Sequence, residues 1–232
     1  MTLAHRYSVN GKVSGQLAAL MEIERCVPIL HGPAGCAFHY RRSMRTRLHP
    51  FYGLASSDLR DRDAVFGGAE GLLAVLAEAA RTEPDLIAVL PSCMAEIIND
   101  DLEGIVREFM VAHEGLPTRV MVVHAGAFSH PDKTSFIQRV KERVHEEGKP
   151  RGRSVSKVQF RGCGFIEVME ALVGQVMEPQ SVAAGTINVE SFGWGYGGRE
   201  KMQEVIDLLA RMGVRVNTLL PTANCAQIAT AP

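Results

Sequence analysis

Two cysteines in this chain occupy positions that suit metal or redox chemistry. Cys36 and Cys93 each follow a short apolar run that ends at a turn containing Gly or Pro. The runs at 27–30 and 86–90 have the length and composition of buried strands. Ligands of open parallel sheets bind at the carboxyl ends of strands, so two thiols at neighbouring strand ends could face one site.

Each cysteine also stands near the start of a predicted helix, at 37–42 after Cys36 and at 94–98 after Cys93. The partial positive charge of a helix N-terminus favours thiolate over thiol. Thiolate is the form that binds iron or zinc. A free cysteine is also common in protein cores. The pattern therefore leaves two interpretations open, a metal or redox site and a pair of small core residues.

The composition is that of an ordinary globular protein and argues against several classes of function. The chain has 232 residues, 46% hydrophobic and 22% charged, with a formal net charge of −1. This balance gives no basic excess for binding nucleic acid. No apolar run is long enough to span a bilayer, and the first residues contain no apolar signal core. An odd count of five cysteines argues against a disulfide framework, and we expect a cytoplasmic protein.

The elements that must position the two cysteines alternate along the chain. Apolar periodicity predicts helices at 13–23, 69–81, 102–112, 136–144, 165–177 and 199–212, and strands at 26–30, 50–54, 86–90, 120–124, 185–192 and 214–220. A strand–turn–helix order of this kind predicts the α/β class, with a parallel sheet flanked by helices on both faces. The glycine-rich loop at 193–198 lacks the dinucleotide spacing, and no P-loop motif occurs.

This order divides the chain into three parts. Residues 1–150 form an α/β domain that carries Cys36 and Cys93, and 151–183 form a connector with a helix. Residues 184–232 begin a second α/β domain, which is incomplete because two strands cannot bury a sheet of their own.

Four stretches of the chain resemble the nitrogenase component 1 superfamily. They are 31–36 (HGPAGC), 63–68 (DAVFGG), 84–89 (PDLIAV) and 93–101 (CMAEIINDD). Their order fits the family pattern, and so do the 57 positions between Cys36 and Cys93. The resemblance looks closest to the β-type subunits of nitrogenase and of its cofactor-assembly scaffold, and it covers the first half of a usual subunit.

The resemblance implies an iron–sulfur protein. In this family two homologous subunits share a cluster bound by cysteines from both, in a hetero- or homo-oligomer such as a heterotetramer. An ATP-dependent iron–sulfur reductase delivers electrons to that cluster, and a second metallocofactor or substrate site lies deeper. Cys36 and Cys93 match two of the cluster cysteines, so residues 1–150 would be the cluster-bearing domain. We expect a 4Fe-4S cluster that the partner subunit completes.

The sequence departs from the nitrogenase pattern at one position. Gly11 stands where nitrogenase has an earlier cysteine. Cys26 does not replace that ligand, because the five strand residues between it and His31 span roughly 16 Å. Cys163 and Cys225 are interpreted as incidental thiols, and their roles stay open. His31 is predicted to be structural, through a hydrogen bond of its ring.

Three functions are compatible with these residues. The first is a subunit of a nitrogenase-like two-component reductase, acting on dinitrogen, a tetrapyrrole or an alkyl thioether. The second is a scaffold subunit on which a metallocofactor is assembled. The third, outside the family, is a cysteine-nucleophile enzyme with His31 or His39 as the base.

Overall fold

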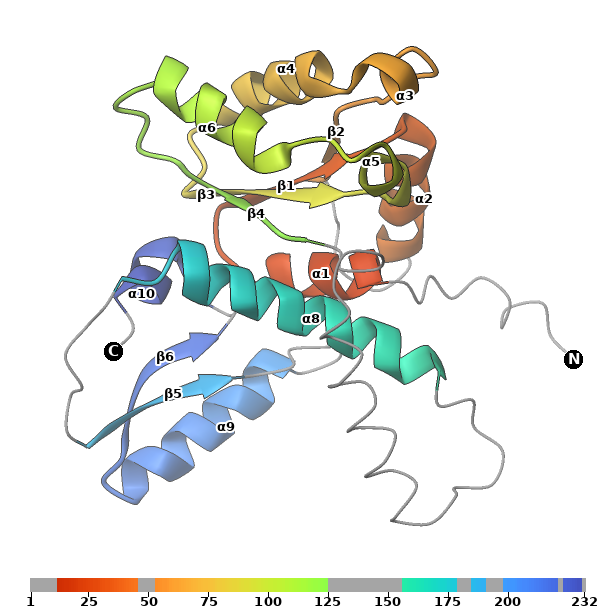
Figure 1. Ribbon diagram of the computed structural model, residues 1–232. Helices are drawn as coiled ribbons and strands as arrows, with labels where there is room; N and C mark the ends of the chain where they lie inside the picture. The colour runs from red at the N-terminus through yellow and green to blue at the C-terminus, as the bar shows by residue number, and fades with distance from the viewer. Residues whose placement is uncertain are drawn as a thin grey trace, which may run out of the picture.

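The first part of the chain folds around a parallel four-stranded sheet. The computed structural model describes residues 12–45, 53–124, 156–178, 185–190, 198–220 and 223–230. The strand order is β2-β1-β3-β4, and every neighbouring pair is parallel (Figure 1). The bounds are β1 (Cys26–His31), β2 (Ala55–Ser56), β3 (Leu86–Pro91) and β4 (Arg119–Val122).

Helices cover both faces of this sheet, and the alternation along β3 explains why. Ile87 and Val89 face the core under α4 (Ala69–Ala80) and α6 (Leu102–Ala112). Leu86, Ala88 and Leu90 face the opposite core, formed with α1 (Lys12–Leu20) and α8 (Ser156–Gln175). All five of these strand residues are fully buried, as expected for a strand covered on both sides. The predicted α/β class is confirmed.

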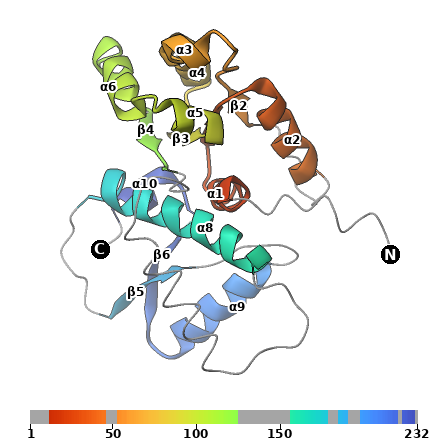
Figure 2. The ribbon, with the colours of Figure 1, turned by 45° about the vertical axis from the view of Figure 1, so that its right-hand side comes forward.

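Helix α8 packs along α1 and is tied to the edge of the first sheet. The Gln175 side chain donates to the Val122 carbonyl at 2.8 Å and accepts from the Val122 amide at 3.0 Å. The side-chain amide of Gln175 therefore satisfies the backbone groups of Val122 on edge strand β4, as a neighbouring strand would. In Figure 2, α8 lies between the four-stranded sheet and the second, smaller sheet.

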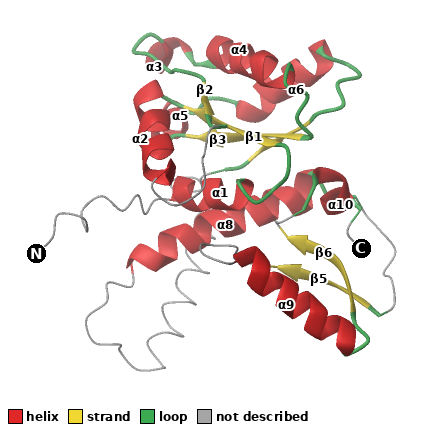
Figure 3. Ribbon diagram, turned by 180° about the vertical axis from the view of Figure 1, so that it is seen from behind, coloured by secondary structure: helices red, strands yellow, loops and turns green. Residues whose placement is uncertain are grey.

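The second sheet is a parallel pair, β5 (Thr186–Glu190) and β6 (Arg215–Leu220). Helix α9 (Gly198–Arg211) connects the two strands, and α10 (Cys225–Ala229) follows β6 (Figure 3). A backbone hydrogen bond of 3.1 Å from the Glu24 amide to the Ala223 carbonyl ties this end of the chain to the start of β1. The described part of the second unit is thus one βαβ unit and a short helix.

Three further helices complete the first part of the chain. They are α2 (Ala34–Arg45), α3 (Asp63–Phe66) and α5 (Cys93–Ile98), which gather at one side of the sheet in Figures 1 and 3. Helices α2 and α5 follow the carboxyl ends of β1 and β3 directly, so this side of the molecule carries both cysteines.

Several predicted elements differ from the structure. The strand expected at 50–54 is wrong for Gly53 and Leu54; β2 pairs with β1 at Ala55 and Ser56 instead. Helix α8 begins nine residues earlier than the apolar pattern at 165–177 indicated, and α3 and α10 were not expected. The helix predicted at 136–144, the loop at 193–197 and Gly11 lie outside the described residues. The division at 150 and 183 stays a prediction.

Within the described ranges, no helix combines the length and the apolar character needed to cross a membrane.

Candidate metal centre

The structure brings Cys36 and Cys93 to the same edge of the sheet. Strands β1 and β3 are direct neighbours, with His31 opposite Pro91 at their carboxyl ends. Cys93 is the first residue of α5 and is exposed, whereas Cys36 lies in the first turn of α2 and is half-buried. The two thiols are close enough for the charge of Cys93 to raise the pKa of Cys36. The predicted juxtaposition is therefore present.

Backbone contacts hold the two cysteine-bearing turns together. The Ser92 amide donates to the His31 carbonyl at 2.9 Å. Gly32 packs so tightly on Ser92 that a Cβ at position 32 would lie 2.4 Å from the serine Oγ. Ser92 also caps α5, because its hydroxyl accepts from the Ala95 amide at 3.3 Å. One serine thus joins the first turn and starts the helix that carries Cys93.

The electrostatics of the pair differ from the expectation of a free thiolate. Burial is the main cause that raises the pKa of Cys36, and repulsion from Cys93 adds to it. The helix N-terminus does not overcome these two effects. A bound cation would reverse them, because coordination deprotonates a thiol and compensates the charge. The raised pKa of Cys36 therefore suits a metal ligand better than it suits an unassisted nucleophile.

Tyr40 is a third member of this site, which the sequence analysis missed. Burial raises the pKa of the Tyr40 phenol, and the charges of Cys36 and Cys93 raise it further. Tyr40 lies four residues after Cys36 in α2, so both side chains lie on the same face of the helix. That spacing was the signal available in the sequence. The half-buried side chain of Tyr40 packs against the same core cluster as Cys36.

His31 is structural, as predicted, and cannot act as a base for either cysteine. It is fully buried, and both ring nitrogens have partners. Nδ1 lies 2.8 Å from the Ser57 hydroxyl, and Nε2 lies 2.9 Å from the Asp100 carboxylate. Burial lowers the pKa of His31, although Asp100 acts in the opposite direction. His39, the other proposed base, is exposed and packs edge-on against Tyr40.

Two further cysteines, Cys26 and Cys225, lie apart from this edge. Cys26 begins β1 at the opposite end from His31, and Cys225 is buried at the start of α10. Both pack against the same core, where burial and the charge of Cys225 raise the pKa of Cys26. The side chain of Cys163 lies outside the described residues. No described group of three or more metal-ligating side chains occurs in these ranges.

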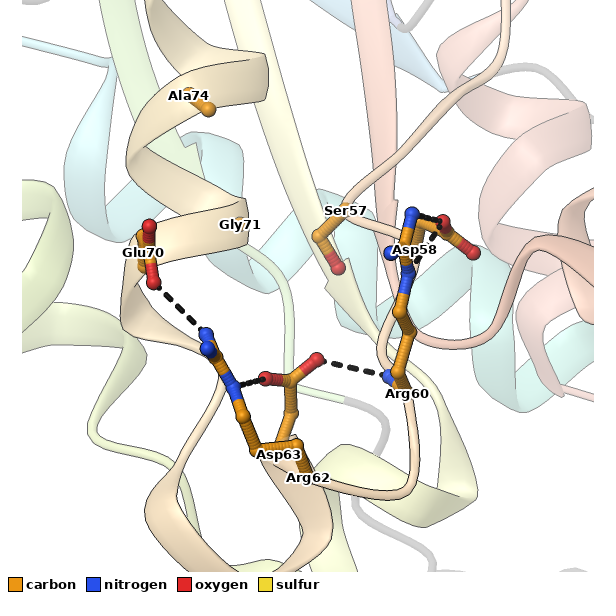
Figure 4. Close-up of a pocket in the computed structure, with 8 residues that line it drawn as sticks. All are labelled: Ser57, Asp58, Arg60, Arg62, Asp63, Glu70, Gly71 and Ala74. Carbon is orange, nitrogen blue, oxygen red and sulfur yellow. Dashed lines mark hydrogen bonds and ion pairs between the residues drawn. The ribbon is translucent and has the colours of Figure 1, made fainter.

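A polar hollow of about 390 Å³ lies beside β2 and is distinct from the cysteine edge (Figure 4). Its charged side chains pair with one another, Arg60 with Asp58 and Arg62 with Glu70 and Asp63. The full lining is Ser57, Asp58, Arg60, Arg62, Asp63, Glu70, Gly71 and Ala74. Three carboxylates face two arginines, so the lining carries a formal charge of −1, and each charged side chain has an ion-pair partner within it.

Comparison with known proteins identifies the family. A family model described as "Nitrogenase component 1 type Oxidoreductase" matches residues 12–232. The chain belongs to the nitrogenase component 1 family. Among solved structures, the one titled "Nitrogenase Cp1 at pH 6.5" has a TM-score of 0.66 at 19% identity, over 90% of this chain and 39% of that one. The nitrogenase component 1 fold is therefore shared.

Curated relatives include nitrogenase β chains and a component of a reductive cyclase complex. A nitrogenase molybdenum-iron protein beta chain of Methanococcus maripaludis is 35% identical over 90% of this chain and 40% of its own length. Component CfbD of the Ni-sirohydrochlorin a,c-diamide reductive cyclase complex of Methanothermobacter thermautotrophicus is 30% identical, over 59% of this chain and 36% of its own. The chain thus spans well under two thirds of the length of these relatives. The resemblance to the family seen in the sequence is confirmed.

Proposed function

We propose that this chain is one subunit of a nitrogenase-like two-component reductase, and that Cys36 and Cys93 bind an iron–sulfur cluster shared with a homologous subunit. The observation that carries the proposal is the pair of thiols at adjacent strand ends, close enough to repel each other. Membership of an oxidoreductase family agrees with this use of the pair.

The residues present suit half of a shared ligand set. A 4Fe-4S cluster takes four thiolates, and Cys36 and Cys93 are the two on this edge among the described residues. Cys93 is exposed, so metal bound there remains open to ligands from another chain. A partner with the same pair of cysteines would complete the set.

A bound cluster supplies one-electron transfer, and the chain's own residues supply its setting. Cys36 and Cys93 hold it, while Ser92 and Gly32 fix the two turns. Electrons would arrive from an ATP-dependent iron–sulfur reductase and pass to a second metallocofactor or to the substrate. Dinitrogen, a tetrapyrrole and an alkyl thioether are the candidate substrate classes.

Exposed apolar side chains on the helices near the cysteines support the proposal that this side of the molecule contacts partner proteins. Four large hydrophobic residues on the rim helices are between 63% and 82% exposed: Phe38 on α2, Val65 and Phe66 on α3, and Ile97 on α5. A cluster of apolar side chains on one side of a domain marks a protein–protein surface. We assign this side to contact with the homologous subunit and the reductase.

The test is anaerobic purification with the co-expressed partner subunit, followed by iron and sulfide analysis and EPR. Cys93→Ser is expected to lose the cluster signal and its iron. Cys26→Ser, the same substitution at the far end of β1, is expected to keep both. Iron per chain that is unchanged in Cys93→Ser would refute the ligand assignment.

A further inference from the structure

A chain of hydrogen bonds links Asp100 to both cysteine-bearing turns. The Asp100 carboxylate accepts from His31 Nε2 at 2.9 Å and from the Gly68 amide at 3.1 Å. On the other side of the ring, Ser57 Oγ lies 2.8 Å from Nδ1 and accepts from the Gly32 amide at 3.1 Å. A neutral ring with its proton on Nε2 satisfies every one of these groups, since the serine hydroxyl then donates to Nδ1.

Asp100 also follows directly on the helix that carries Cys93. Helix α5 ends at Asn99, which adopts the left-handed conformation with φ 57° and ψ 46°. This conformation is tolerated by Asn and reverses the chain. The Asp100 amide then donates to the Ala95 carbonyl at 3.3 Å. The six-residue helix α5 therefore has the thiol at its first residue and the carboxylate just past its end.

The third partner of Asp100 is the segment that follows the exposed residues Val65 and Phe66. Gly67 has φ +83°, and a Cβ there would lie 3.1 Å from the carboxylate. A Cβ on Gly68 would lie 2.1 Å from the Leu59 side chain, 2.8 Å from the His31 ring and 3.1 Å from the carboxylate. The backbone of the two glycines therefore lies close against the His31–Asp100 pair, and a side chain at either position would not fit without a shift.

We propose that Asp100 is a positioning residue for the cysteine pair, which fixes the Cys36 turn, helix α5 and the Val65–Phe66 segment relative to one another. The part of this inference that concerns a bound cluster depends on the function proposed above. The geometric part does not, because it concerns only the separation of two side chains.

A largely buried carboxylate with two donors is a strong tie. Hydrogen bonds to a charged group are about twice as strong as neutral ones. Both donors bond the same oxygen, Oδ2, and the Gly68 amide also lies 3.3 Å from Oδ1. In Asp100→Asn the charge is lost, and the NH2 group faces the Gly68 amide in either orientation of the side chain. The tie to Gly68 is therefore weakened, and the Cys36 turn and helix α5 are held less firmly relative to that segment.

The experiment measures the geometry first, in iron-free protein. A short bis-alkylating reagent bridges Cys36 and Cys93 only while the thiols lie close together, and peptide mass spectrometry quantifies the bridge. We expect Asp100→Asn to slow bridging by about threefold or more, as for other lost couplings between neighbouring groups. The matched control is Asp101→Asn, which removes an adjacent charge but keeps a side chain able to cap α6.

A second pair of variants guards against a folding defect. Gly68→Ala is expected to slow bridging in the same direction, whereas Gly174→Ala, whose added methyl meets nothing within 4 Å, is expected to leave it unchanged. Denaturation midpoints identify any variant that fails to fold, and the other variant then decides. Bridging rates in Asp100→Asn and Gly68→Ala equal to those of their controls would overturn the inference.

The iron-loaded protein gives the second readout. Asp100→Asn is expected to keep its iron, since both thiols remain, but to change the EPR line shape and shift the midpoint potential relative to Asp101→Asn. An unchanged spectrum and potential with full iron would also overturn the inference. Wild-type protein without iron would refute the proposed function instead, and the bridging rates would still decide the role of Asp100.

Discussion

Gly32→Ala tests the contact that holds the two cysteine turns together. The added Cβ would lie 2.5 Å from the Cβ of Ser92 and 2.4 Å from its Oγ. Carbon atoms in contact prefer about 3.5–4.0 Å, so the turns must separate by about 1 Å. Overpacking of this kind costs about 1–3 kcal/mol. A domain that is stable by about 5–15 kcal/mol survives that loss in the folded state.

Metal binding is far more sensitive to a displacement of the ligands than folding is. Ligand distances in metal sites vary by only about 0.2 Å, so a displacement of about 1 Å breaks the geometry of the pair. We therefore expect Gly32→Ala to be folded, with a lower free energy of unfolding, and to bind little iron. Urea denaturation and iron analysis on the same anaerobic preparation measure both effects.

The matched control is Gly35→Ala in the same turn, where the added methyl meets nothing within 4 Å. It lies in the first turn of α2, where alanine is a good helix former, so stability and iron content are expected to stay close to wild type. If Gly32→Ala had the denaturation midpoint and iron content of Gly35→Ala, the contact with Ser92 would not be what positions the turns.

Three further predictions follow from the site. Ser92→Ala removes the cap of α5 and is expected to lower the free energy of unfolding by about 1 kcal/mol in urea denaturation; no change would mean that the cap contributes nothing. Burial lowers the pKa of His31, so stability is complete above the ordinary histidine pKa of about 6.5 and falls as the pH drops below it. Denaturation midpoints measured from pH 8 to pH 5 are expected to fall less steeply in His31→Asn, and parallel curves would contradict this. Because the pKa of Cys36 is raised, its alkylation by iodoacetamide in iron-free protein is expected to be slow near neutral pH and to rise only at alkaline pH, as followed by peptide mass spectrometry. Rapid alkylation near neutral pH would show a free thiolate.

Strong apolar patterns allowed most of the first sheet to be predicted. Leu86–Leu90 is apolar throughout, and the structure buries all of it between two helical layers. The helix predicted at 102–112 has the bounds of α6, and Asp101 caps it. Strand β2 was misplaced because a two-residue edge strand carries almost no periodicity, and its position is set by pairing with Ile29 and Leu30.

The candidate site was only half predictable. Cys36, Cys93 and the structural role of His31 followed from turn residues and motif spacing. Tyr40 was missed because a single aromatic residue on a helix has many ordinary explanations. Asp100 was noted only as part of the 93–101 stretch, since its contact with His31 spans 69 positions of the chain. No local pattern reports a contact of that separation.

The sequence by itself determined which chemistry is available: two thiols after two buried strands, in a spacing shared with one family. Its local signals suffice for this because strand ends, turns and caps depend on neighbouring residues. Only the tertiary structure decided that the two strand ends before the cysteines are neighbours, that Gly32 must lack a side chain against Ser92, and that Asp100 joins three separate segments. Those facts depend on atoms brought together by packing from distant parts of the chain, where a few tenths of an ångström decide whether a contact exists.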